Sequence, residues 1–123
     1  MLSSSKLVAF AATTNALEAR RFYEGVLGLR LVADEPFALV FDANGTMLRI
    51  QKADQVAPPP FTVLGWQVSD IEAAVDQLSA RGVRFNEYPG MRQDARGIWQ
   101  APGGGRVAWF KDPDGSTLSL TQF

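Results

Sequence analysis

The sequence contains two copies of one hairpin pattern, with their glycines 70 residues apart. "VFDANGTMLRI" runs from Val40 to Ile50, and "FKDPDGSTLSL" runs from Phe110 to Leu120. In each copy, a short apolar strand leads into a turn that holds Asp and ends in Gly, and a second apolar strand follows. Self-similarity at such a long interval indicates a duplicated supersecondary unit. The sequence therefore predicts two related modules.

The segments before the two hairpins also follow one plan. The apolar run "KLVAFAATT" is followed by Asn15 and then Glu18, a capping-box pattern that starts a helix over "ALEARRFYEGVLG". The run "FTVLGWQV" is followed by Ser69 and Glu72 in the same arrangement, so Ser69 is predicted to cap the second helix. Further strands are predicted at "LRLVAD" and "VRFNEY", and each half should fold as β-α-β-β-β.

A connector with three consecutive prolines separates the two modules. Because proline restricts the backbone, this stretch should be stiff. We expect a single domain over residues 1–123, with modules at about 5–53 and 61–123 joined by a linker at 54–60.

The second module is longer than the first. Asn15 and Asp70 lie 55 residues apart, whereas the hairpin glycines lie 70 apart, which leaves an excess of 15 residues. This excess falls in the segment 89–105, which is rich in Gly and Pro. Loops of this length in a compact domain are usually functional or mobile, so we predict that 89–105 is the most mobile internal segment.

The chain contains no His and no Cys, and this absence excludes several kinds of chemistry. Ser-His and Cys-His nucleophile systems cannot be built, and neither can disulfides. Any metal ion would have oxygen ligands only. The sequence therefore argues against a catalytic transition metal.

Charge and hydropathy exclude two classes of partner. The formal net charge is -1, whereas nucleic-acid binding needs a basic surplus. No apolar run approaches the roughly 18 residues of a membrane span, and the N-terminal "MLSSSKLVAF" has no signal-peptide pattern. We expect a cytoplasmic protein that binds neither nucleic acid nor membrane.

Three segments together resemble the vicinal oxygen chelate (VOC) superfamily, which includes glyoxalase I, extradiol dioxygenases, and fosfomycin and bleomycin resistance proteins. They are "NALEARRFYEGVLGLRLV", "QVSDIEAAVDQLSARGV" and "VAWFKDPDGSTLSL". The resemblance covers nearly the whole chain. It implies an α+β fold, the glyoxalase/bleomycin resistance/dihydroxybiphenyl dioxygenase fold, in which two βαβββ modules in tandem form a curved mixed-sheet cup around a ligand.

Enzymes of that superfamily typically bind a divalent metal through the first and last strands of each module. The resemblance places these four positions at Val8, Arg49, Val63 and Ser119. Two are aliphatic, one is a cation, and Ser119 offers at most a weak oxygen ligand. We therefore expect no metal and no cofactor.

The same resemblance implies that alternate strand residues line the cup. A lining of aliphatic and aromatic side chains with a few polar groups is typical of a small-molecule site. Arg49 could clamp an anionic group, or instead pair with Glu87 or another internal acid. Ser119 could bind the ligand or be a satisfied strand serine, and Trp99 could close over the ligand or fix its own loop. The predicted ligand-binding residues are Val8, Phe10, Arg49, Val63, Gln67, Trp99 and Ser119.

These observations predict a metal-free protein of the glyoxalase/bleomycin-resistance type that binds a small, partly apolar and anionic organic molecule. Drug sequestration is one form of this function, and a homodimer is the expected assembly. One alternative is a lyase, isomerase or dioxygenase-type enzyme of the same superfamily, for which Glu87 and Tyr88 are the nearest candidate bases. A second alternative is an interaction subunit without a ligand. The sequence does not decide whether a reaction is catalysed.

Overall fold

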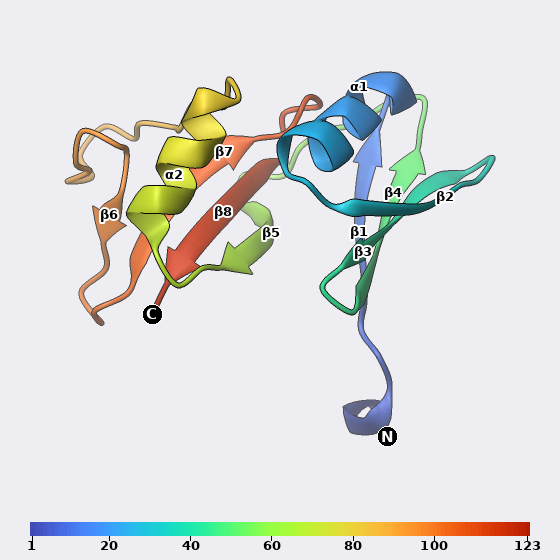
Figure 1. Ribbon diagram of the computed structural model, residues 1–123, viewed down its shortest axis with the longest axis horizontal. Coiled ribbons are helices and arrows are strands. Elements are labelled where there is room, and N and C mark those ends of the chain that lie inside the picture. The colour runs from blue at the N-terminus through green and yellow to red at the C-terminus, as the bar shows by residue number, and fades with distance from the viewer. The chain divides into compact units, whose positions relative to one another are not determined.

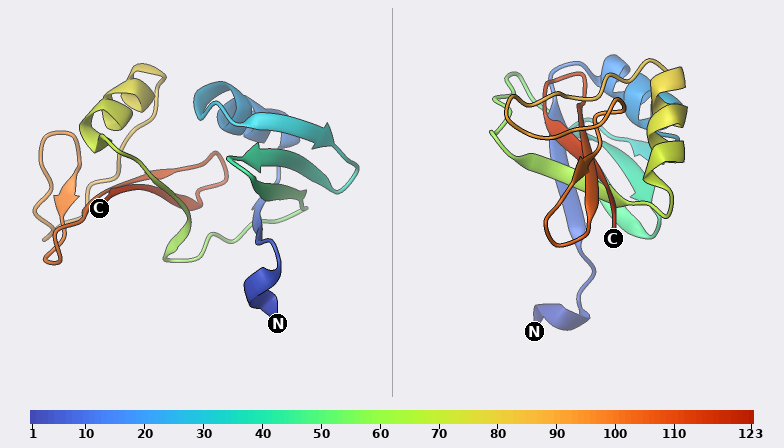
Figure 2. Two further views of the ribbon diagram at one scale, coloured as in Figure 1. Left: turned by 60° about the horizontal axis from the view of Figure 1, so that its bottom comes forward. Right: turned by 90° about the vertical axis from the view of Figure 1, so that its left-hand side faces the viewer.

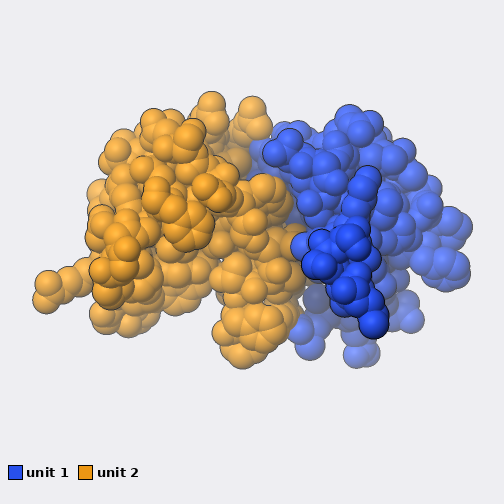
Figure 3. Space-filling view, turned by 90° about the horizontal axis from the view of Figure 1, so that it is seen from below, with its two compact units in different colours: residues 1–57 blue, residues 58–123 orange.

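The computed structural model describes all residues, 1–123, and divides into two compact units. One unit is Met1–Ala57 and the other is Pro58–Phe123 (Figure 3). The division between Ala57 and Pro58 lies inside the segment predicted as the linker. No helix in the structure is both long and apolar enough to cross a membrane.

The N-terminal unit is a four-stranded mixed sheet with one helical segment packed on it and a short 3-10 helix before the first strand (Figure 1). The strand order is β1-β4-β3-β2, with β1 parallel to β4 and the other pairs antiparallel. Its elements are η1 (Leu2–Ser4), β1 (Val8–Thr13), α1 (Ala16–Arg20), η2 (Arg21–Val26), β2 (Arg30–Asp34), β3 (Ala38–Ala43) and β4 (Thr46–Lys52).

The C-terminal unit repeats this plan with strand order β5-β8-β7-β6 (Figures 1 and 2). Here β5 is parallel to β8, while β7 is antiparallel to both β8 and β6. The two sheets confirm the predicted α+β class and the repeat of the hairpins. The elements are β5 (Thr62–Gln67), α2 (Ile71–Ala80), β6 (Trp99–Gln100), β7 (Arg106–Lys111) and β8 (Thr117–Gln122).

Each sheet buries one face under its own helical segment. In the N-terminal unit the fully buried Tyr23 contacts Phe41, with ring centroids 5.9 Å apart. In the C-terminal unit α2 packs on β7 and β8 through Ile71 and Val75. Alternate residues of the strands fill these two cores, among them Leu39, Leu48, Ile50, Ala108, Phe110, Leu118 and Leu120.

The first helix begins as predicted but continues differently. The Asn15 side chain accepts a hydrogen bond from the backbone N–H of Glu18 at 3.2 Å. The Glu18 carboxylate pairs with Arg21 at 2.9 Å, so the return half of the capping box is not formed. After Arg20 the chain adopts π-helical geometry over Arg21–Val26. The expected single α-helix is therefore an α-turn followed by a wider π-turn.

The predicted cap of the second helix is wrong by one residue. Asp70, not Ser69, is the N-cap residue, and its carboxylate accepts a hydrogen bond from the N–H of Ala73 at 3.1 Å. The side-chain amide oxygen of Gln122 accepts a second one from Ile71 at 2.9 Å. Gln122 closes the helix N-terminus from the end of β8, 51 residues away, which local sequence does not reveal.

The predicted strand over Val83–Tyr88 is also wrong. Only Phe85 forms a bridge to β7, and the next residue, Asn86, donates its N–H to the carbonyl of Trp109 at 2.7 Å. The fourth strand of the sheet is instead β6, which lies inside the segment predicted as a loop. The chain returns to the same edge of β7 within the segment 89–105, so two short segments share the edge that one strand takes in the first unit.

Side-chain hydrogen bonds hold the inserted segment, residues 89–105, to the rest of the C-terminal unit. The Gln93 amide accepts the N–H of Tyr88 at 2.7 Å and donates to the carbonyls of Asn86 and Gly97 at 2.8 and 2.9 Å. Ile98 is 3% exposed, and its N–H bonds to the Asp94 carboxylate at 2.9 Å. We therefore expect mobility at the exposed turn 102–104 rather than over the whole segment.

An ion pair ties the same segment to α2. The Arg96 guanidinium donates two hydrogen bonds to the Asp76 carboxylate, at 2.9 and 3.1 Å. These hydrogen bonds, with the positive charge of Arg96, lower the pKa of Asp76. The carboxylate of Glu72 lies 3.5 Å from Arg96 and 3.6 Å from Arg106. The cluster joins the helix, the inserted segment and β7.

The second hairpin turn depends on a buried carboxylate. Asp112 is 5% exposed, and its Oδ1 accepts the N–H groups of Asp114 and Ser116 at 3.0 and 2.9 Å. In the first hairpin the half-buried Asp42 accepts one turn N–H, that of Gly45 at 2.8 Å, and its other oxygen pairs with Arg30 at 3.4 Å. The two turns share an Asp but differ in how much they depend on it.

We predict that Asp112→Ala destabilises the protein by about 2–3 kcal/mol, because a buried N–H group and a partly buried one lose a charged acceptor. Asp112→Asn keeps a carbonyl oxygen at the same place and should cost less than half as much. Urea unfolding of the three proteins measures the difference. Equal losses for the two variants would show that the acceptor oxygen is not what matters.

The Arg96–Asp76 ion pair predicts a pH-dependent attachment of the inserted segment. Because the folded-state pKa of Asp76 is lowered, the pair stabilises this attachment above about pH 4, the ordinary Asp range. The stabilisation is lost as the pH falls through the lowered value. Hydrogen exchange corrected for intrinsic rates should show protection of the Ile98 amide at pH 6 and less at pH 3.

Two controls accompany this measurement. Gly103 lies in the exposed turn and should exchange quickly at both pH values. Asp76→Asn should lower the protection of Ile98 at pH 6 and reduce its pH dependence. If Asp76→Asn left the protection at pH 6 unchanged, the ion pair would not be what holds the segment.

Candidate functional site

The open face of the C-terminal sheet carries the candidate site. On β8, Leu118 and Leu120 are buried against α2, so Thr117, Ser119 and Thr121 alternate onto the other face. The antiparallel register places β7 residues directly beside them on that face. The cross-strand pairs are Lys111 with Thr117, Trp109 with Ser119, and Val107 with Thr121.

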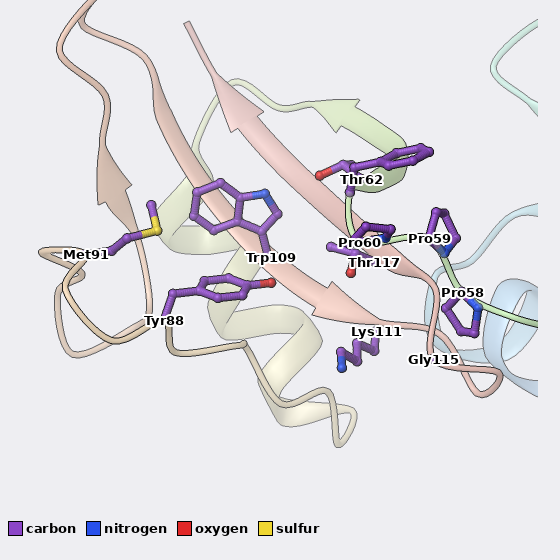
Figure 4. A pocket seen from close by; sticks show the side chains of 11 residues that line it. Pro58, Pro59, Pro60, Thr62, Tyr88, Met91, Trp109, Lys111, Gly115 and Thr117 are labelled. Atoms are coloured by element: carbon purple, nitrogen blue, oxygen red, sulfur yellow. The ribbon is translucent and has the colours of Figure 1, made fainter.

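A pocket of about 680 Å³ opens on this face, and all of its lining residues belong to the C-terminal unit (Figure 4). One wall is the triproline stretch with the first residues of β5. The opposite wall is Tyr88 and Met91, and β7 and β8 form the floor between them. The lining residues are Pro58, Pro59, Pro60, Phe61, Thr62, Tyr88, Met91, Trp109, Lys111, Gly115 and Thr117.

Aromatic contacts fix the Trp109 side chain in the pocket. The Tyr88 ring lies perpendicular to the indole at a centroid distance of 5.5 Å, with an interplanar angle of 89°. On β6, Trp99 lies 5.9 Å from Trp109 with the two planes at 35°. Trp99 thus supports Trp109 without itself lining the pocket.

The polar groups of the pocket are mainly hydrogen-bond donors. No acidic residue lines it, and Lys111 forms no ion pair within the unit. The Tyr88 hydroxyl accepts a hydrogen bond from the Asn86 side chain at 2.9 Å, which leaves its own proton to donate. The side chains of Trp109 and Thr117 make no hydrogen bond. Such a pocket suits a ligand that carries negative charge or acceptor oxygens.

Ser119 lies beside this pocket in an unusual setting. The residue is 6% exposed, and its hydroxyl makes no hydrogen bond within the protein. Its neighbour on β5 is Gly65, where an added Cβ would lie 2.6 Å from the Ser119 oxygen. Glycine at position 65 therefore leaves room for the Ser119 hydroxyl, whose oxygen remains accessible to solvent.

The N-terminal unit places three predicted site residues on the open face of its own sheet. Phe10 on β1 is directly paired with Arg49 on β4. Val8 lies two residues before Phe10 and therefore faces the same side of the sheet. Phe10 is 51% and Val8 38% exposed. Arg49 donates to the carboxylate of Glu35 at 2.9 Å. Arg49 is therefore ion-paired, although with Glu35 rather than with Glu87.

The four positions at which the superfamily resemblance places metal ligands do not suit a metal ion. Val8 and Val63 have no ligand atom, and Arg49 is a cation paired with Glu35. Ser119 offers one neutral hydroxyl. No group of three or more acidic side chains in the structure could hold a metal ion.

Only some of the predicted site residues of the C-terminal unit lie together on the open face. Ser119 and Gln67 share the open face, since Gly65 pairs with Ser119 and Gln67 with Thr121. Trp99 reaches it through the contact with Trp109. Val63 lies at a register shift between Thr62 and Leu64, where the alternation of β5 is interrupted.

Sequence reasoning missed the pocket-lining Trp109, Lys111 and Met91, and it named Tyr88 only as a candidate base of the enzyme alternative. The sequence did contain a signal for Trp109 and Lys111. If Lys111 and Thr117 flank the Asp-Pro-Asp-Gly turn as a pair, then Trp109 must face the same way as Ser119. For Tyr88 and Met91 there was no such signal, because their place depends on the path of the inserted segment.

Comparison with known proteins agrees with this architecture. Residues 7–120 match the model of the Glyoxalase/Bleomycin resistance protein/Dioxygenase superfamily. The chain belongs to this superfamily. The match covers both units and both hairpins, and it confirms the resemblance seen in the three sequence segments. No curated protein gives a significant match.

Solved structures of this superfamily share the fold at low identity. A member from Sphaerobacter thermophilus DSM 20745 is 24% identical, with a TM-score of 0.71 over 95% of this chain and 97% of that one. A glyoxalase/bleomycin resistance protein from Catenulispora acidiphila DSM 44928 is 22% identical, with a TM-score of 0.72 over 98% and 99%. A lactoylglutathione lyase from Agrobacterium tumefaciens is 19% identical, with a TM-score of 0.71 over 97% and 93%. These likenesses show the fold and do not assign a substrate.

The close approach of Gly65 to Ser119 predicts energetic coupling between the two positions. Gly65→Ala should destabilise the protein by about 1 kcal/mol, because the new methyl group displaces the Ser119 hydroxyl. In a Ser119→Ala background the same change should be neutral or stabilising. A double-mutant cycle from urea unfolding measures the coupling, and a coupling energy of zero would contradict the contact.

Proposed function

We propose that this protein binds a small, partly apolar organic anion on the open face of the C-terminal sheet, without a metal ion. The observation that carries the proposal is the pocket over Trp109 and Lys111, which combines apolar walls with donor groups and contains no acid. Pockets that bind small molecules have this composition of apolar lining and a few oriented polar groups.

Two features of the pocket support the binding of a partly apolar anion. Lys111 lies at the pocket without a competing carboxylate, so its ammonium group can pair with the ligand. The walls of proline, methionine and aromatic side chains would stabilise an apolar body by about 25 cal/mol per Å² buried, before ordering costs. Ser119 supplies a further hydroxyl, which one polar atom of the ligand would satisfy.

We assign Arg49 a smaller part in anion binding. Its guanidinium already contacts Glu35 at 2.9 Å, so a ligand anion would compete with that carboxylate. Together with Val8 and Phe10, Arg49 remains a proposed ligand contact on the face of the N-terminal unit. In the C-terminal unit, Val63, Gln67 and Trp99 likewise remain proposed contacts.

The enzyme alternative rests on one observation. The Tyr88 hydroxyl lies in the pocket and is oriented by Asn86, so it is placed to exchange a proton with a bound ligand. Glu87, the other candidate base, does not line this pocket. A metal-independent lyase or isomerase would therefore act through Tyr88, and Tyr88→Phe should abolish turnover while retaining binding.

Three further parts of the proposal rest on the sequence. We propose a homodimer, a cytoplasmic location, and drug sequestration as one form of the binding function. The open pocket favours ligand binding over the alternative of an interaction subunit that has lost its ligand.

The binding proposal is tested with a saturated bicyclic acid, decahydronaphthalene-2-carboxylate, and its neutral amide. We predict that wild-type protein binds the acid more tightly and that Lys111→Met weakens acid binding about tenfold, because a charged hydrogen bond is lost. Amide binding should be unchanged. Titration calorimetry of the wild type and the variant measures both.

Arg49→Met is the matched control, since it removes a cation that already has a partner. We expect less than a threefold loss of acid binding in this variant. No binding of the acid to wild-type protein would overturn the proposed function. A larger loss in Arg49→Met than in Lys111→Met would move the anion site to the N-terminal unit.

A further inference from the structure

We infer that the ligand is a flat aromatic acid whose ring stacks on Trp109 while its carboxylate pairs with Lys111. The inference rests on the proposed function and narrows it to one chemical class. The general proposal requires only an apolar body and an anion, whereas the arrangement of the aromatic groups favours a planar body.

The spacing of Trp109 and Lys111 on β7 favours a ligand with two fused rings. Trp109 and Lys111 are two residues apart on β7, so their side chains leave the same face of the sheet roughly 7 Å apart. An anion attached directly to a fused two-ring system spans this interval better than one attached to a single ring. The spacing therefore favours a bicyclic acid over a benzoate-sized one.

The indole is held in place before a ligand arrives. Tyr88 contacts Trp109 at right angles, and Trp99 flanks it at 35°, so the indole has neighbours on two sides. Figure 4 shows its broad face among the lining residues, with Met91 and Tyr88 to one side and Pro60 and Thr62 to the other. A ring that is already fixed loses little conformational entropy on stacking, which raises affinity for a planar partner.

The walls of the pocket and its hydrogen-bond donors also favour a flat ligand. Met91 is polarisable and makes favourable contacts with aromatic rings, and the prolines opposite it are rigid. The indole N–H of Trp109 and the hydroxyl of Thr117 have no hydrogen-bond partner in the protein. They can donate to ring substituents or to the second carboxylate oxygen. A phosphate ligand is less favoured, because Lys111 is the only cation that lines the pocket.

The test compares naphthalene-2-carboxylate with decahydronaphthalene-2-carboxylate, which has the same carbon skeleton and charge but no flat ring. Wild-type protein should bind the aromatic acid about three- to tenfold more tightly, the range expected for one aromatic contact. Trp109→Leu should weaken binding of both acids, because apolar wall area is lost, and it should remove the preference, so that the two acids bind equally. Trp109→Phe keeps a ring and should keep most of the preference.

A second measurement protects the test against a variant that folds poorly. In wild-type protein, the aromatic acid should shift the Trp109 indole N–H resonance by its ring current, and the saturated acid should not. Trp99→Leu removes a neighbour that supports the indole from outside the pocket, so it should reduce the preference less than Trp109→Leu does. Equal binding of the two acids with no ring-current shift would overturn this inference and leave the proposed function intact. Failure of both acids to bind would overturn both.

Discussion

Strand β8 is hydrogen-bonded on both sides, in parallel to β5 and antiparallel to β7, and the rest of the C-terminal unit depends on this pairing. A strand that is fixed on both edges cannot slip by one residue without exchanging its two faces. Leu118 and Leu120 are therefore committed to the core under α2, and Ser119 is committed to the open face. Strand β4 has the same position in the N-terminal unit, between β1 and β3.

The parts of the fold that could be predicted from the sequence are those with local signals. The two hairpins carry Asp-to-Gly turns between alternating strands, and Asn15 precedes an amphipathic segment, so their elements lie where the pattern indicated. The errors concern pairing over long distances. The edge of β7 is completed by Phe85, which precedes the segment 89–105, and by β6, which lies inside it. No local propensity decides how two such segments share one edge.

The site was less predictable for the same reason. Strand alternation was sufficient to place Ser119 on the open face, but not to find the space around its hydroxyl, which depends on Gly65 in another strand. The sequence presented Arg49 as a cation among aliphatic residues, whereas its partner Glu35 comes from the turn between β2 and β3. The superfamily resemblance indicated which positions to examine. The pairing of strands determined what surrounds them.

The distribution of tryptophan has a practical consequence for studies of folding. Trp66, Trp99 and Trp109 all belong to the C-terminal unit, and the N-terminal unit contains none. Intrinsic fluorescence excited at the red edge of the indole band therefore reports on only one of the two units. A denaturation curve recorded in this way would look like a single transition even if the N-terminal unit unfolded separately. Far-ultraviolet circular dichroism, which senses both sheets, would reveal whether the two units unfold as one.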